Sequence, residues 1–269
     1  MDGITYINEE TYHAFYVECL SDELKKAIKK HLSDICFGHI KAERAELKPN
    51  IYGYKKSIKD FLSRLEEKRE GTKKGMIGEL LTHILIREYL PEFKVNTPFF
   101  NMEENSIKKG FDLVLLNTND NELWITEVKS GEKDTNNQTS DKKIENLLKK
   151  AKNDLNERLN KSEDMLWQNA INGCSISMKN NDDLKNVVIE LLENYQEEIA
   201  TSLNKNIITS GVLFNSTDEK FSINSLKKVH DAWENELFFK KIIILAIQES
   251  TYQEVITFFK MEVSSWRKI

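Results

Sequence analysis

Apolar residues recur along this chain with two different periods, and stretches of the two kinds alternate. Spacings of three and four residues predict amphipathic helices, and short apolar runs between turn residues predict strands. The predicted helices cover residues 22–37, 54–69, 73–90, 141–159, 184–202 and 252–266. The predicted extended segments cover residues 11–20, 94–100, 111–117, 123–128, 207–214 and 242–247. This mixture predicts an α/β fold with a central mixed β-sheet flanked by helices and with extra helices at both ends.

Two of the strand-like runs flank a short polar turn and predict a β-hairpin. The first is 111–117, the second is 123–128, and the turn residues between them include Asn119 and Asp120. A hairpin centred between Asn119 and Asp120 places Asp112 directly opposite Glu127. Lys129 shares a face with Glu127, because residues two apart in a strand point to the same side. Two carboxylates and an ammonium are therefore predicted to meet at one end of an apolar hairpin.

Buried charges are costly unless they are paired or bind a metal, so this cluster calls for an explanation. A structural explanation is open for each residue. Glu127 and Lys129 fit an ordinary ion pair on an exposed strand end. Asp112 fits the start of a strand after a glycine-containing turn.

A fourth charged residue, Glu79, lies on the predicted helix 73–90. Its neighbours one and two turns away along the helix are Met76, Thr82, His83 and Ile86. The carboxylate therefore belongs to a largely apolar helix face. An ion pair with His83 or with a nearby lysine is the structural alternative.

A helical glutamate, then a strand aspartate, then Glu-x-Lys on the next strand resembles the PD-(D/E)XK nuclease superfamily over about residues 72–160. The resemblance implies a metal-dependent phosphodiesterase. Carboxylate and carbonyl oxygens suit Mg²⁺ or Mn²⁺, so Asp112, Glu127 and the Val128 carbonyl are the expected metal ligands. Glu79 is expected to bind a metal-coordinated water or a second ion. Lys129 is expected to orient the attacking water or to offset charge at the scissile phosphate.

Four segments carry a closer resemblance, and they are 78–81 (GELL), 84–88 (ILIRE), 109–112 (KGFD) and 123–129 (LWITEVK). Together they resemble HamA, the small subunit family of the Hachiman anti-phage defence system. Glu79, Asp112, Glu127 and Lys129 match the nuclease positions of that family. Phe111 and Val128 depart from the small residues common there. The resemblance implies a DNA-degrading effector that is restrained by a HamB-like superfamily 2 helicase.

Composition adds bounds on the class of protein. The chain has 269 residues, 39% hydrophobic, 31% charged, and a net charge of -5. Residues 41–74 hold 11 basic and 6 acidic residues, whereas residues 180–236 hold 5 basic and 11 acidic. Such polarity suits one face for DNA and another for a protein partner, although two solvated helix surfaces also explain it. No apolar run is long enough to span a bilayer.

The cysteines, the N-terminal segment and the histidines argue against disulfide bonds, secretion and a zinc site. Three widely spaced cysteines and an acidic start without an apolar stretch favour a cytoplasmic protein with reduced thiols. The five histidines form no zinc-type spacing. One domain over 1–269 is expected, with a catalytic core at about 72–160 and an N-terminal extension at 1–71. Two alternatives stay open, a catalytically inactive nuclease-fold subunit that binds DNA or the helicase, and a restriction-type endonuclease.

Overall fold

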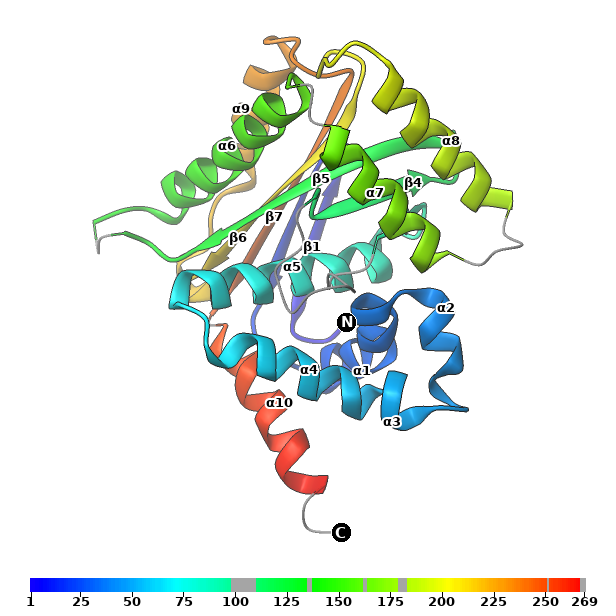
Figure 1. Cartoon of the computed structure of the whole chain (residues 1–269). Coiled ribbons are helices and arrows are strands. Elements are labelled where there is room, and N and C mark those ends of the chain that lie inside the picture. The colour runs from blue at the N-terminus through cyan, green and yellow to red at the C-terminus, as the bar shows by residue number, and fades with distance from the viewer. Residues whose placement is uncertain (98–109, 135–136, 162–163, 179–182, 251, 267–269) are drawn as a thin grey trace.

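The fold is built on one mixed β-sheet (Figure 1). The computed structural model describes residues 1–97, 110–134, 137–161, 164–178, 183–250 and 252–266. Within these ranges seven strands form the sheet, in the order β1-β2-β7-β6-β5-β4-β3. The strands are β1 (Ile4–Glu9), β2 (Tyr12–Val17), β3 (Phe93–Val95), β4 (Leu113–Asn117), β5 (Glu122–Gly131), β6 (Asn206–Phe214) and β7 (Lys241–Glu249).

The centre of the sheet is parallel and its two flanks are antiparallel. Strands β2, β7, β6 and β5 run parallel to one another, while β1–β2, β5–β4 and β4–β3 are antiparallel pairs. Parallel neighbours need long crossovers, and helices supply them here. The strands β6 and β7 are buried along almost their whole length, as expected for strands covered on both faces. The predicted α/β fold with a mixed sheet is therefore confirmed.

Helices cover both faces of the sheet. They are α1 (Asp22–Phe37), α2 (His39–Ala42), α3 (Pro49–Tyr52), α4 (Tyr54–Glu66), α5 (Glu70–Tyr89), α6 (Ser140–Leu159), α7 (Asp164–Ser177), α8 (Asp183–Glu197), α9 (Ile223–Glu234) and α10 (Gln253–Ser265). Two 3₁₀ turns, at Glu43–Ala45 and Thr217–Glu219, complete the described elements. The apolar sides of α1, α4, α5 and α10 form a continuous core with one sheet face. Helices α6 to α9 cover the other face.

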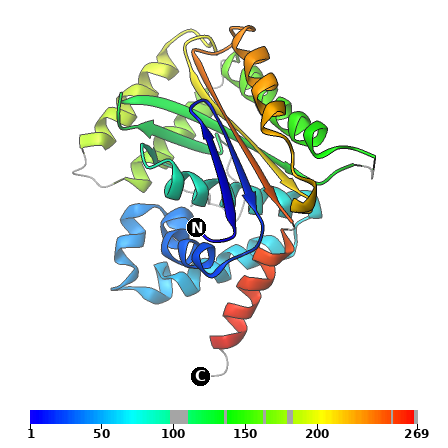
Figure 2. The ribbon, with the colours of Figure 1, turned by 180° about the vertical axis from the view of Figure 1, so that it is seen from behind.

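The ends of the chain lie on the side of the α1–α5 layer. Figure 2 shows the β1–β2 hairpin, in dark blue, along the back of the sheet, and α10, in red, projecting away from the body. Rings from β1, β2 and α5 stack at this edge, since Tyr6, Phe15 and Tyr89 have centroids 4.5 to 5.3 Å apart. The N-terminal hairpin is thus an integral edge of the sheet.

Most predicted elements are present, with several corrections. Strand β1 and helices α7 and α9 were absent from the sequence prediction. Gly71, between the predicted helices 54–69 and 73–90, lies in the first turn of α5, because α4 ends at Glu66 and α5 begins at Glu70. The predicted extended segment 94–100 is a strand only at Phe93–Val95, and residues 98–100 lie outside the described ranges.

Candidate metal-dependent active site

The predicted hairpin forms with the predicted register. Leu113 pairs with Thr126 and Asn117 with Glu122, so the centre lies between Asn119 and Asp120. The Asn117 and Asp120 side chains each accept a hydrogen bond from a backbone N–H two residues ahead, which closes the turn locally. One further step of this register brings Asp112 opposite Glu127.

Asp112 lies just before β4, beside the backbone of β5. Its Oδ2 accepts a hydrogen bond from the Val128 N–H at 2.7 Å. In a strand, the N–H and C=O of one residue point to the same side, so the Val128 carbonyl faces the side on which Asp112 lies. Within the described residues no strand pairs with Val128–Gly131 on that side, because β4 begins only at Leu113. Among the described residues, the edge of β5 next to the Asp112 carboxylate is therefore open.

Glu127 projects from β5 toward α6 and is almost fully buried, with 6% of its side chain exposed. Its two carboxylate oxygens contact different cations. Oε1 accepts from Lys129 Nζ at 2.7 Å, and Oε2 accepts from the Arg158 guanidinium at 2.7 Å. Charge-assisted hydrogen bonds of this kind offset the cost of burying the carboxylate.

Lys129 lies between two carboxylates. Its ammonium contacts Glu127 and also the Asp154 carboxylate of α6, at 2.6 Å. Burial by itself would lower the pKa of Lys129, but the two carboxylates raise the pKa above its ordinary value. Lys129 is therefore a permanent cation near neutral pH, suited to stabilise negative charge rather than to accept a proton.

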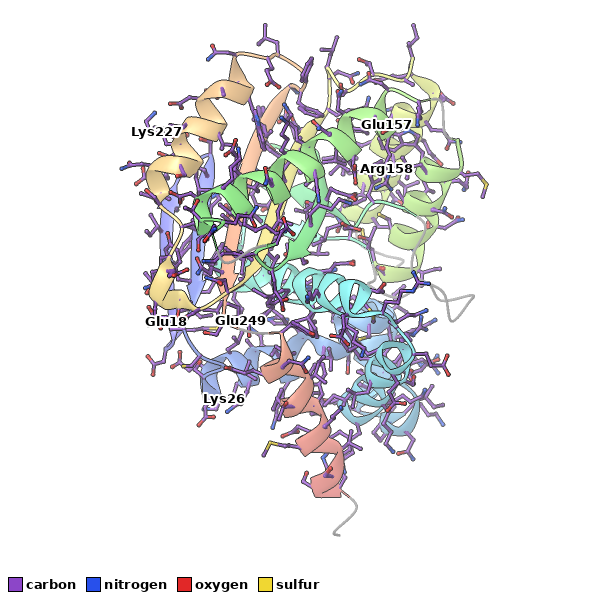
Figure 3. The ribbon with its side chains drawn as sticks, turned by 90° about the vertical axis from the view of Figure 1, so that its left-hand side faces the viewer. Glu18, Lys26, Glu157, Arg158, Lys227 and Glu249 are labelled. Carbon is purple, nitrogen blue, oxygen red and sulfur yellow. The ribbon has the colours of Figure 1, made fainter. Side chains whose placement is uncertain are left out.

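Arg158 and Asp154 are site residues that the sequence prediction missed. Figure 3 shows Arg158 on α6, next to Glu157. Besides Glu127, its guanidinium donates to the Gly110 carbonyl and lies over the Phe111 ring at 5.3 Å. Arg158 thus ties the residues preceding β4 to β5. The available signal was the pair of opposite charges four residues apart at the border of the apolar α6 stripe.

Glu79 occupies a different position. It is half-buried on α5, the helix on the opposite sheet face from α6. The preceding residue, Gly78, lies against β5, where an added Cβ would come within 2.0 Å of Ser130 Oγ. The structure therefore brings Asp112, Glu127 and Lys129 together at β5. Glu79 belongs to the helix on the other face of the sheet, and its neighbour Gly78 contacts Ser130 of β5.

The donor set suits a hard divalent cation. The Asp112 carboxylate lies at the β5 edge beside Val128, and the Glu127 carboxylate projects from the preceding residue toward α6. Mg²⁺ is commonly held by one or two carboxylates while it keeps several waters. An ionised carboxylate has about four lone-pair sites, so hydrogen-bonded Asp112 and Glu127 retain acceptor capacity. Among the described residues, no group of three or more histidine, cysteine, aspartate or glutamate side chains has the arrangement of a metal site. Any ion here would therefore keep waters or the carbonyl among its ligands.

The sequence was also compared with known protein families. The family model for HamA matches residues 2–263. The chain belongs to the HamA family. This membership supports a role for the chain as a subunit of the Hachiman anti-phage defence system. The HamA match covers the sheet, both helical layers and all five of the predicted site residues.

Two further searches, of curated proteins and of solved structures, found no match to the chain. In the portion of the chain that the structure describes, no helix is long and apolar enough to cross a membrane.

Proposed function

We propose that this HamA-family subunit is a metal-dependent DNA endonuclease, and that the open edge of β5 is its active site. The observation that carries the proposal is the meeting of Asp112 with β5 beside Glu127 and Lys129. The hairpin register supports the proposal, because it sets Asp112 beside the strand that carries Glu127, Val128 and Lys129. Carboxylate and carbonyl oxygens are ligands that a hard cation accepts in phosphodiester hydrolysis.

The residues have distinct roles in the proposal. Asp112, Glu127 and the Val128 carbonyl would hold Mg²⁺ or Mn²⁺. Glu79 comes from the helix on the other sheet face, next to the Gly78–Ser130 contact with β5, and would bind a water of that ion or a second ion. When bound, the metal supplies activation of water and charge stabilisation at the phosphate. Lys129 offsets the negative charge of the scissile phosphate, and its raised pKa keeps it cationic. The partner is a HamB-like helicase that controls when DNA reaches the site.

One observation favours a second candidate, a subunit that binds DNA or the helicase without cleaving. Both Glu127 oxygens are held by cations, and Lys129 has a further carboxylate partner in Asp154. Such a closed ion-pair network is also what a structural cluster looks like. The two candidates differ in whether the cluster takes up a metal and hydrolyses DNA.

Cleavage of plasmid DNA with Mg²⁺ or Mn²⁺ tests the proposal. The unmodified chain is compared with Asp112→Ala, Lys129→Ala and a control, Lys149→Ala, at an exposed position of α6. We expect nicking by the unmodified chain and the control, and a loss of at least 100-fold, on the order of 3 kcal/mol, in the two site variants. Equal nicking by all four proteins would refute the site. The assay is repeated with the helicase partner present, and absence of cleavage under both conditions would support the binding-only subunit.

A further inference from the structure

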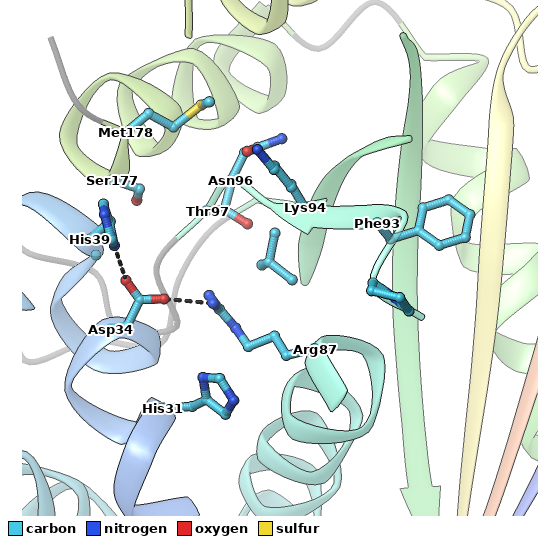
Figure 4. Close-up of a pocket in the computed structure, with 13 residues that line it drawn as sticks. His31, Asp34, His39, Arg87, Phe93, Lys94, Asn96, Thr97, Ser177 and Met178 are labelled. Carbon is cyan, nitrogen blue, oxygen red and sulfur yellow. Dashed lines mark hydrogen bonds and ion pairs between the residues drawn. The ribbon is translucent and has the colours of Figure 1, made fainter. Parts of the chain in front are cut away.

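A polar cavity lies at the β3 edge of the sheet, and its residues Asn96 and Thr97 bond to β4 at Val114, two residues from Asp112. Its volume is about 360 Å³. Helix α1, the beginning of α2, the end of α5, strand β3 and the end of α7 contribute its walls. Figure 4 shows that side chains from these separate elements point into one space. Small-molecule pockets typically have volumes of about 300–1,000 Å³, so this cavity suits a ligand of mononucleotide size.

The charges around this cavity favour an anion. Among its lining residues, Asp34 is the one carboxylate, and both of its oxygens are engaged. Oδ2 pairs with Arg87 at 2.6 Å, and Oδ1 contacts His39 at 3.2 Å. Lys94 also lines the cavity, and no carboxylate of the described residues lies within ion-pair distance of its ammonium. Among the residues that the structure describes, the Lys94 ammonium of the lining therefore has no balancing carboxylate.

Asn96 provides the observation that points to a ligand. Its side chain is 2% exposed and lines the cavity, and its amide nitrogen has no hydrogen-bond partner among the described residues. The backbone N–H of Asn96 is satisfied, since it donates to the Val114 carbonyl at 2.9 Å. Nearly all buried polar side-chain atoms in proteins have a partner, so the unpaired amide of this lining residue calls for an acceptor.

Thr97 and Arg87 add two more hydrogen-bond donors to the lining of the cavity. The Thr97 hydroxyl oxygen accepts from the Val114 N–H at 3.2 Å, which leaves its own O–H to donate. The Nε of Arg87 is buried and has no hydrogen-bond partner among the described residues. Together with Lys94 and Asn96, these groups approach from β3 and α5, on different sides of the cavity. Several donors from different directions match an anion with several acceptor oxygens.

We infer that this cavity binds a phosphate monoester. Phosphate carries three strong acceptor oxygens and more than one negative charge, whereas a carboxylate offers two oxygens in one plane. Lysine provides the charge, and the Asn96 amide and the Thr97 hydroxyl provide neutral donors. A free nucleotide and the phosphorylated end of a nucleic acid share this chemistry. The inference does not rest on the proposed nuclease activity, because none of its residues belongs to the hairpin site.

Binding is measured by isothermal titration calorimetry without divalent metal. The probes are inorganic phosphate, AMP, and one oligonucleotide with either a 5′-phosphate or a 5′-hydroxyl. We expect phosphate and AMP to bind, and Lys94→Ala and Asn96→Leu each to weaken AMP binding at least tenfold. Lys260→Ala, at an exposed lysine of α10, is expected to bind AMP like the unmodified chain. A preference for the 5′-phosphorylated oligonucleotide over AMP would assign the site to nucleic-acid ends, and the reverse would assign it to free nucleotides.

Two results would overturn the inference. One is no binding of phosphate or AMP by the unmodified chain. The other is unchanged AMP affinity in both Lys94→Ala and Asn96→Leu. Lys94 is exposed, so its replacement keeps the test valid even where Asn96→Leu fails to fold. Acetate is titrated as well, and acetate binding as tight as phosphate binding would exclude the phosphate class.

Discussion

Replacing Arg158 with alanine is expected to lower the free energy of unfolding by about 1–3 kcal/mol. The guanidinium holds one oxygen of the buried Glu127 carboxylate and also the Gly110 carbonyl. Breaking a fully buried ion pair costs about 3–5 kcal/mol, because it leaves an uncompensated charge. The cost is lower here for two reasons. Lys129 still contacts Glu127, and 24% of the Arg158 side chain is exposed.

A double-mutant cycle separates the interaction from other effects of the substitution. Urea denaturation is measured for the unmodified chain, Arg158→Ala, Glu127→Gln and the double variant. We expect a coupling energy of about 1–2 kcal/mol, because glutamine carries no charge for Arg158 to balance. Lys149→Ala, at an exposed site on the same helix, is expected to change stability by less than about 0.5 kcal/mol. A coupling energy of zero would refute the claim that Arg158 holds Glu127.

Two further predictions concern packing and pH. Gly78→Ala is expected to lower the free energy of unfolding by about 1–3 kcal/mol, because the new Cβ would come within 2.0 Å of Ser130 Oγ. Gly75→Ala is the control, because its Cβ would meet no atom within 4 Å, and it is expected to stabilise α5 by up to ~1 kcal/mol. Ser130→Gly should rescue Gly78→Ala in thermal unfolding, and no rescue would place the clash elsewhere. Burial raises the pKa of the Glu249 carboxyl well above its ordinary 4.5, so the folded chain keeps a proton that the unfolded chain loses above about that pH. Stability should therefore fall as pH rises from 5 to 8, by at most ~1.4 kcal/mol per pH unit, and Glu249→Gln should remove this dependence in urea denaturation; parallel pH curves for the two proteins would contradict it.

Local patterns determine how much of the fold can be predicted from the sequence. The bounds of α1 match the prediction, because Ser21 accepts from the Leu24 N–H and two acidic residues follow it. Helix α7 has apolar residues on several sides, so it lacks the one-sided stripe that identifies a helix. Strand β1 mixes apolar and polar residues without strict alternation, and its pairing with β2 stabilises it.

In the candidate site too, contacts between residues close in sequence could be predicted and contacts between distant segments could not. The placement of Asp112 opposite Glu127 could be predicted, because the register of a hairpin depends on residues close in sequence. Arg158 lies 31 residues beyond Glu127 and reaches it only through the packing of α6 on the sheet. The position of Glu79 across the sheet likewise depends on the tertiary contact of Gly78 with Ser130. Contacts between distant segments are therefore the part of the site that the sequence alone does not reveal.

Metal uptake by the free subunit tests the proposed site most directly, because it requires neither DNA nor the helicase. Mn²⁺ binding is measured by calorimetry and by the loss of the free-ion paramagnetic resonance signal. We predict saturable binding that is lost in Asp112→Asn and in Glu127→Gln and is retained in Lys260→Ala. Equal Mn²⁺ binding by all four proteins, or none by the unmodified chain, would contradict a metal site at the open edge of β5.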